Sequence, residues 1–154
     1  MQTICVIDDD ETMRKFMISS LKESGFNVID YDCGREFKLD FANHEIDLII
    51  TDIHMEGING IELLLDMKNT NANIPVILVT GGVSDSFANT INTDLVQYLV
   101  KEMGAEILIE KPINAHKLIN TINNILNAKL VQQDSKKCFE FFNSTKYKHA
   151  FYIE

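Results

Sequence analysis

Short apolar runs alternate with amphipathic segments along this chain, and the alternation predicts its fold. The apolar runs predict strands over about residues 3–7 and 26–31, in a run ending at residue 52, in a run opened by Pro75, and in a run ending near residue 109. Apolar residues at helical spacing predict helices over about 11–24, 35–43, 60–68 and 94–103, and after residue 114. Strands that alternate with helices are typical of a parallel sheet with right-handed crossovers, so the predicted fold class is α/β of the (βα)5 type.

The predicted helices carry apolar side chains that are expected to face the sheet. These residues are Met13, Phe16, Met17, Leu21, Phe37, Phe41, Ile61, Leu64, Leu65, Leu95, Leu99, Met103, Leu118, Ile119, Ile122, Ile125 and Leu126. Gly25 and Gly104 stand where left-handed helix ends are expected, and Asn114 is the expected N-cap of the last helix. Two segments exceed this minimal unit: a long polar loop at 81–93 and the residues from 128 to 154.

Chain length and charge indicate a single domain that does not bind nucleic acid. A chain of 154 residues is expected to form one domain with its own core. Residues 1–127 hold 9 Lys/Arg and 20 Asp/Glu, a net charge of −11, whereas residues 128–154 hold 5 Lys and 3 Asp/Glu, a net charge of +2. An acidic body repels the phosphates of nucleic acids, so no nucleic-acid partner is expected.

The number of cysteines and the hydropathy of the chain indicate the cellular compartment. Three widely spaced cysteines argue against a disulfide framework and a zinc site, and suit a reducing cytoplasm. We see neither an apolar stretch long enough for a membrane span nor a signal peptide. The expectation is therefore a cytoplasmic protein with no membrane contact.

Polar residues follow several of the apolar runs at the points where the predicted strands end. Asp8 and Asp9 close the first run, Asp52 the third and Thr80 the fourth, and Lys111 follows the fifth. In an open parallel sheet the ligand site lies beyond the carboxyl ends of the strands, so these side chains should meet in one crevice. Three carboxylates, a hydroxyl and an ammonium suit a divalent metal and a phosphoryl group.

Clustered carboxylates have an energetic cost that a cation removes. Two of them about 5 Å apart repel by roughly 3 kcal/mol at an effective dielectric constant near 20. The cluster should therefore favour a bound cation or raise the pKa of one acid. For the first pair alone, the residues from Asp8 to Glu11 have another reading, in which they simply begin the first helix.

At this point the sequence resembles a known family. The segments VIDDDETMRK, LIITDIHMEGINGIELL, VILVTGG and ILIEKPI, in this order and at this spacing, resemble the receiver domain of bacterial two-component response regulators, as in the stand-alone chemotaxis receiver. The resemblance covers about residues 1–128. It implies a flavodoxin-like, doubly wound sheet of five parallel strands in the order 2-1-3-4-5.

The resemblance also implies roles for the polar residues. Asp52 would accept a phosphoryl group from a histidine kinase or a phosphotransfer protein, Lys111 would pair with the phosphoryl oxygens, and Thr80 would transmit the switch. Asp9 and Asp52 would bind Mg2+ directly, Asp8 through water, and the backbone carbonyl of His54 would be a further ligand. The protein would be a phosphoacceptor switch rather than an enzyme.

The side chain of His54 has two readings. It could reach the phosphoryl group or an attacking water and set the lifetime of the phosphorylated state, or it could be an exposed loop histidine.

The sequence departs from the family pattern at several places. Glu56 replaces the usual proline, Leu108 stands where many receivers carry an aromatic switch residue, and the 81–93 loop is longer than usual. The tail, taken as residues 129–154, has no counterpart in a minimal receiver and is rich in aromatic residues: Phe139, Phe141, Phe142, Tyr147, Phe151 and Tyr152.

The tail is too short for a DNA-binding module, so the expected output is contact with an unknown downstream protein, with a homodimer left open. We expect the tail to pack against the fourth and fifth helical units.

Other functions stay open at this stage. Asp8, Asp10 and Thr12 fit the DxDxT signature of haloacid-dehalogenase-like phosphatases, with Asp8 as nucleophile, although no Asp or Glu occurs between Lys111 and Asp134 where that family needs an acidic pair. A further reading is a pseudo-receiver that binds a partner without phosphorylation. The chain could also be a piece of a larger regulator.

Overall fold

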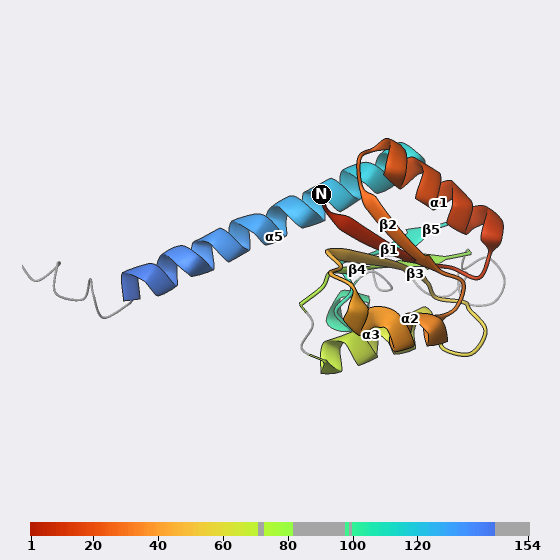
Figure 1. Cartoon of the computed structure of the whole chain (residues 1–154), viewed down its shortest axis with the longest axis horizontal. Helices are drawn as coiled ribbons and strands as arrows, with labels where there is room; N and C mark the ends of the chain where they lie inside the picture. The colour runs from red at the N-terminus through yellow and green to blue at the C-terminus, as the bar shows by residue number, and fades with distance from the viewer. Residues whose placement is uncertain (71–72, 82–97, 99, 144–154) are drawn as a thin grey trace, which may run out of the picture.

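The predicted (βα)5 architecture is confirmed. The computed structural model describes residues 1–70, 73–81, 98 and 100–143, with side chains up to residue 137. The elements are β1 (Thr3–Ile7), α1 (Glu11–Glu23), β2 (Asn27–Tyr31), α2 (Gly34–Asp40), the 3-10 turn η1 (Phe41–Asn43), β3 (Leu48–Asp52), α3 (Gly60–Asn69), β4 (Val76–Thr80), β5 (Ile107–Glu110) and α5 (Ala115–Asn143). The strands pair in parallel in the order β2-β1-β3-β4-β5 (Figure 1).

Helices cover both faces of the sheet, as a doubly wound fold requires. Figure 1 shows α1 and α5 on one face and α2 and α3 on the other. Side chains alternate between the faces along each strand, so Ile4 and Val6 pack with α1 and α5 while Cys5 and Ile7 pack toward α2 and α3. Central strands that are buried on both faces explain why the runs are apolar throughout rather than alternating.

The strand register brings the carboxyl ends of the central strands to one edge. Ile7 pairs with Thr51 and Asp52 pairs with Val79. Thr80 pairs with Glu110, directly before Lys111. All the predicted site residues therefore follow or close strands at the same edge of the sheet.

Two helix faces differ from the prediction. In α3 the buried side chains are Leu63, Leu64 and Met67, whereas Leu65 is 45% exposed. Phe16 of α1 is 40% exposed, although it was expected to face the sheet. Successive helical residues are about 100° apart, so a residue next to the buried stripe lies at its rim or outside it.

The last helix is much longer than predicted. It continues to Asn143 instead of ending near residue 127. The inward-facing apolar stripe ends at Leu126, but no glycine or proline follows within the helix, and its residues are mostly compatible with a helix. Periodicity marks only the part of a helix that packs, so the sequence pattern ended before the helix did.

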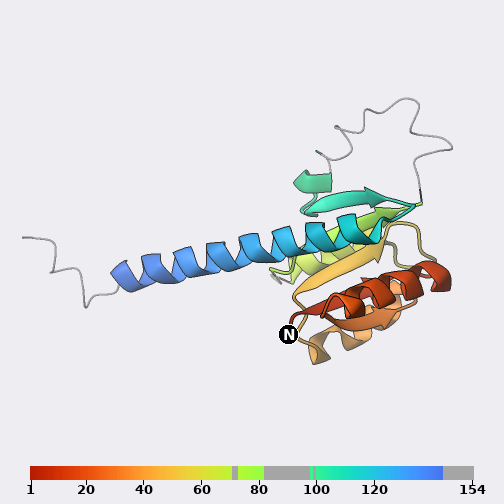
Figure 2. The ribbon, with the colours of Figure 1, turned by 90° about the horizontal axis from the view of Figure 1, so that it is seen from above.

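The extension of α5 does not pack on the body as expected. Figure 2 shows α5 running past the amino-terminal ends of the strands and away from the sheet. Leu130 is 51% exposed and Val131 is 66% exposed. The predicted packing of the tail against its own domain is therefore wrong for these residues, and the tail aromatics lie outside the described side chains.

The fourth helical unit lies mostly outside the described residues. Val100 and Met103 pack on the core, and Gly104 adopts the expected left-handed conformation, with φ +94°. Leu95 and Leu99, and nearly all of the predicted 81–93 loop, are outside the described residues. None of the described helices combines the length and the apolar character needed to cross a bilayer.

Candidate functional site

The turn after β1 is organised around the buried carboxylate of Asp8. Asp8 is fully buried, its backbone N–H donates to the Tyr31 carbonyl at 3.2 Å, and its Oδ1 accepts from the Asp10 backbone N–H at 2.9 Å. Asp10 is the N-cap of α1, accepting from the backbone N–H groups of Thr12 and Met13 at 2.8 and 3.1 Å. Within the Asp8–Glu11 segment, Asp10 therefore caps the helix, and the side chain of Asp8 remains available to the site.

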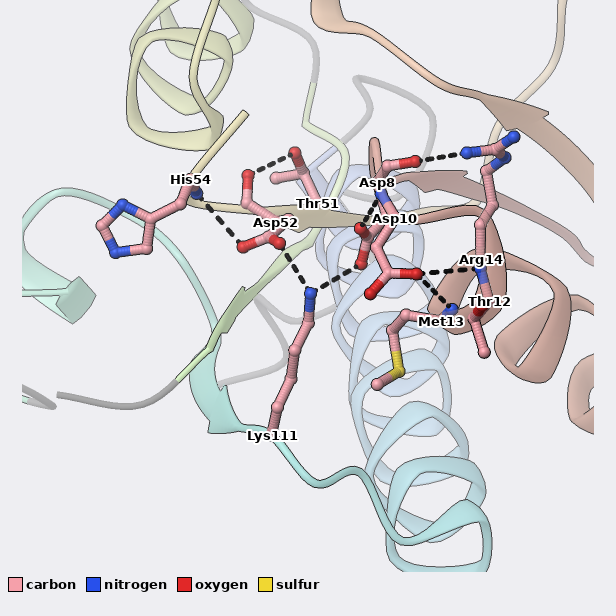
Figure 3. A network of polar contacts seen from close by, with 9 residues as sticks. All are labelled: Asp8, Asp10, Thr12, Met13, Arg14, Thr51, Asp52, His54 and Lys111. Atoms are coloured by element: carbon pink, nitrogen blue, oxygen red, sulfur yellow. Dashed lines mark hydrogen bonds and ion pairs between the residues drawn. The ribbon is translucent and has the colours of Figure 1, made fainter. Parts of the chain in front are cut away.

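Arg14, near the start of α1, stabilises the loop between β1 and α1. Its Nη1 donates to the Asp8 carbonyl at 2.6 Å, and its Nε donates to Asp30 Oδ2 of β2 at 3.2 Å. The Arg14 side chain is only 15% exposed. Figure 3 shows the guanidinium reaching back over the turn. The sequence prediction missed this residue, because its partner is a main-chain carbonyl and its second partner belongs to another strand.

Asp52 is fixed by its own turn at the end of β3. It is 5% exposed, and its Oδ1 accepts from the His54 backbone N–H at 3.1 Å. The start of α3 presses against its backbone, since a Cβ at Gly60 would lie 2.3 Å from the Asp52 carbonyl oxygen. Only glycine fits at position 60, and the close approach fixes the loop that carries His54. The His54 side chain itself is exposed.

Lys111 joins the two buried carboxylates. Its Nζ donates to Asp52 Oδ2 at 2.6 Å and lies 3.0 Å from Asp8 Oδ2 (Figure 3). Burial disfavours the Lys111 ammonium, but Asp52 and Asp8 outweigh burial, so its pKa is raised above the ordinary value. Burial raises the pKa of Asp8, Asp52 adds to that rise, and Lys111 and the Asp10 N–H oppose it. One acid of the cluster thus has a raised pKa, as predicted, but the main cause is the burial of Asp8 rather than repulsion from the neighbouring carboxylate.

The acidic cluster has the ligand chemistry of a hard divalent cation. Oxygens of Asp8, Asp9 and Asp52 lie within 4.8 Å of one another. Asp8 Oδ2 is buried, and among the described residues no donor is aligned to hydrogen-bond with it, although Lys111 is close. Asp9 is exposed, which leaves its carboxylate accessible from solvent. A buried oxygen whose nearest partner is the Lys111 ammonium, beside two further carboxylates, fits a Mg2+ ion with part of its hydration shell.

Thr80 lies at the same edge, on the side of the sheet nearest β5. It is 4% exposed, and its carbonyl accepts from the Lys111 backbone N–H at 2.8 Å. The structure therefore brings Asp8, Asp9, Asp52 and Lys111 into one cluster, with Thr80 at the neighbouring strand end. A cavity of about 740 Å³ opens beside it, lined by residues that include Asp9, His54 and Glu62. Leu108 is 7% exposed and belongs to the core, so no aromatic ring stands at that position.

Comparison with known proteins identifies the family. The family model of the response regulator receiver domain matches residues 4–123. Among curated proteins, the chain is 32% identical over 126 residues to the transcriptional regulatory protein CpxR of Escherichia coli, covering 82% of this chain and 50% of CpxR. It is 29% identical over 145 residues to a cyclic di-GMP phosphodiesterase of Thermotoga maritima, covering 89% of this chain and 36% of that protein. The chain thus spans half or less of the length of these relatives.

Solved structures show the same fold. A response regulator receiver domain protein from Clostridium thermocellum superposes with a TM-score of 0.71 and 28% identity, covering 86% of this chain and 99% of that one. A CheY-like receiver domain protein from Methanospirillum hungatei gives a TM-score of 0.72 at 23% identity, covering 86% of this chain and 98% of that one. The alternative of a haloacid-dehalogenase-like phosphatase is contradicted by the family match, and Asp10 of its signature is engaged as a helix cap. The chain belongs to the response regulator receiver domain family.

Proposed function

We propose that this protein is a phosphoacceptor switch in which Asp52 takes a phosphoryl group from a histidine kinase or a phosphotransfer protein. The observation that carries the proposal is the contact of 2.6 Å between Asp52 Oδ2 and the Lys111 ammonium, beside the buried Asp8. One oxygen of Asp52 forms the new bond to phosphorus while the bond from phosphorus to the donor's nitrogen or oxygen breaks. Lys111 neutralises the charge carried by the phosphoryl oxygens during and after transfer.

Mg2+ is the proposed cofactor. Asp9 and Asp52 would hold it directly, Asp8 would hold it through water, and the His54 carbonyl would complete the protein ligands. The ion supplies further charge neutralisation for the phosphoryl oxygens. In the absence of the ion, Lys111 partly compensates the cluster, which keeps the two buried carboxylates tolerable in the folded protein.

The output would be made by protein contacts in the cytoplasm, without catalysis on a separate substrate. Phosphorylation places about two negative charges on Asp52, close to Thr80 at the neighbouring strand end, and Thr80 would respond to them. The exposed extension of α5 is the element by which this chain would reach a downstream protein or a second copy. Size-exclusion chromatography with light scattering, on the full chain and on a chain lacking residues 133–154, tests whether α5 forms a homodimer.

The test of the proposal is the intact mass of the protein after incubation with Mg2+ and acetyl phosphate. Wild type should gain one phosphoryl group and Asp52→Asn none, and omission of Mg2+ should prevent the gain. Asp9→Asn, which removes a proposed metal ligand but leaves the acceptor, should gain the group slowly and need more Mg2+. A wild-type protein that binds Mg2+ yet gains no mass would instead indicate a pseudo-receiver that binds its partner unphosphorylated.

A further inference from the structure

A second crevice lies at the opposite, amino-terminal edge of the sheet. It has a volume of about 410 Å³ and is lined by the end of α3, the starts of β4 and β5, and the middle of α5. That volume is within the range of small-molecule sites, roughly 300–1,000 Å³. Its polar lining residues are Lys68, Asn73, Glu106, Asn124, Lys129 and Gln132.

The wall formed by α5 lies beyond the residues that the family model matches. Asn124, Lys129 and Gln132 all follow residue 123, where the match to the receiver family ends. Figure 2 shows α5 continuing straight past this edge of the sheet. A helix that ended soon after residue 123 would leave the crevice open on one side, so the long α5 is what encloses it.

Two lysines give the crevice its charge. Neither the Lys68 nor the Lys129 ammonium forms an ion pair with a carboxylate of the described residues. Lys129 is half-buried, and Lys68 Nζ has only a weak contact of 3.4 Å with the Glu102 carbonyl. Lys68 is exposed, so the cost of partial burial without a counter-charge falls on Lys129, and an anion bound there would remove that cost.

Gly104 lets Lys68 reach the crevice. A Cβ at position 104 would lie 1.7 Å from Cε of Lys68, so the lysine stem occupies the space that a side chain would take. Among the described lining residues, the carboxylate of Glu106 is the one acidic group, so their net charge is +1. Side-chain amides of Asn73, Asn124 and Gln132 add donors and acceptors around this charge.

We propose that this crevice binds a small organic anion whose carboxylate or phosphate oxygens pair with Lys68 and Lys129. Glu106 favours a ligand that carries a hydroxyl or an amino group at its other end, which selects hydroxy acids, amino acids or sugar phosphates over simple anions. Such a ligand joins α5 to α3 and β5, and binding therefore stabilises the enclosed part of α5. The site is separate from the acidic cluster and does not depend on phosphorylation of Asp52.

The experiment is a titration of the ¹⁵N-labelled full chain, without Mg2+, followed by NMR. The probes are citrate, glycerol 3-phosphate and inorganic phosphate, each with ionic strength held constant by NaCl. Backbone signals of Gly104 and Glu106 and the side-chain amide of Gln132 should shift and saturate. Citrate against glycerol 3-phosphate distinguishes carboxylate from phosphate recognition, and inorganic phosphate should bind more weakly than glycerol 3-phosphate.

Variants decide whether the crevice is responsible. The double variant Lys68→Met/Lys129→Met should weaken binding about tenfold or more, because it removes both charged hydrogen bonds. Ala128→Glu, which adds a carboxylate to the wall within the helix, should weaken it similarly, and Lys22→Met, an exposed lysine on α1, should leave it unchanged. Shifts that do not saturate for any probe, or that persist at the same affinity in both crevice variants, would overturn the proposal. Saturable shifts confined to the turns around Asp8 and Asp52 would overturn it too, since they place the anion on Lys111.

Discussion

The two edges of the sheet are built in opposite ways. At the carboxyl edge, Asp8, Asp52 and Lys111 compensate one another within 3.0 Å. At the amino edge, Lys68 and Lys129 have no carboxylate partner among the described residues. The first edge is matched by the family model, whereas the second is closed by a helix that continues past that match. The cluster at the carboxyl edge is thus a network of charges that already compensate one another, whereas the two lysines at the amino edge have no such compensation among the described residues.

The two halves of α5 also differ, in how deeply their apolar side chains are buried. Its first part carries Leu118, Ile122 and Leu126, all buried against the sheet, and its last part carries exposed Leu130 and Val131. Burial rather than helix propensity should therefore determine which half contributes to stability. The predictions that follow test these contrasts in order of expected effect.

The largest expected effect comes from truncating the buried half of α5. Leu126→Ala should lower the free energy of unfolding by about 3 kcal/mol, because it leaves a cavity beneath the sheet. Leu130→Ala, the matched change one helical turn later, should cost less than about 0.5 kcal/mol. Urea unfolding followed by circular dichroism measures both. Equal losses in the two variants would mean that residues near 130 are buried in solution by a partner or by a second copy.

The next effect concerns Arg14, which supports the turn without belonging to the acidic cluster. Arg14→Met removes the donors to the Asp8 carbonyl and to Asp30, so Asp8 and Asp9 lose their fixed placement. The affinity for Mg2+, measured by calorimetry, should fall about tenfold, as for other residues that support a ligand. Lys15→Met, the neighbouring surface lysine, is the control and should keep the wild-type affinity. If Arg14→Met also kept it, the contacts of Asp8 with Tyr31, Asp10 and Lys111 would be sufficient to position it.

A smaller effect is expected at His54, on the loop after Asp52. Its exposed imidazole borders the cavity beside the cluster, through which water would reach a phosphoryl group on Asp52. His54→Ala should change the rate of loss of the phosphoryl group by about threefold, less than 1 kcal/mol of activation free energy. Decay of the phosphorylated protein, followed by intact mass, measures it, with His116→Ala on α5 as the control. An unchanged rate would mean that only the backbone of His54, as a proposed metal ligand, contributes to the site.

The smallest expected effect is at Asp40, the last residue of α2. Its carboxylate accepts from Asn43, Tyr31 and His44 at 2.7, 2.8 and 2.8 Å, and these bonds hold the pKa of Asp40 at about 2. A folded pKa below the unfolded value of 3.8 gives stability that is present above pH 3.8 and is lost as pH falls toward 2. In Asp40→Asn the melting temperature should therefore depend less on pH between about 4 and 2 than in wild type. Asp32→Asn, an exposed aspartate on the same side of the sheet, should retain the wild-type slope; a wild-type slope in Asp40→Asn would contradict the prediction.

The acidic cluster is the part of the site that could be predicted from the sequence. Asp8, Asp52, Thr80 and Lys111 each stand at or just after a strand end, and parallel strands bring those ends to one edge, so the cluster follows from the sequence pattern. The supporting role of Arg14 could not be predicted from its position, because Arg14 does not follow a strand end. Its acceptors, a main-chain carbonyl and a side chain on β2, are known only from the structure. Leu65 and Phe16 were assigned to buried faces because each adjoins a buried stripe. In α3 a run of three leucines fits more than one direction of the stripe, and packing buried Leu63 and Leu64 instead of Leu65.

By itself, the sequence determined the alternation of strands and helices and the membership of the acidic cluster, since these depend on local periodicity and on the common edge at which parallel strands end. The strand order and the two-sided sheet followed from the resemblance to the receiver family, and the structure confirms them. Only the tertiary structure decided the length of α5, the exposure of its second half and the crevice at the amino edge. Those features depend on which surfaces meet after folding, and residues such as Lys68 and Lys129, far apart in the chain, carry no local signal that they will line one crevice.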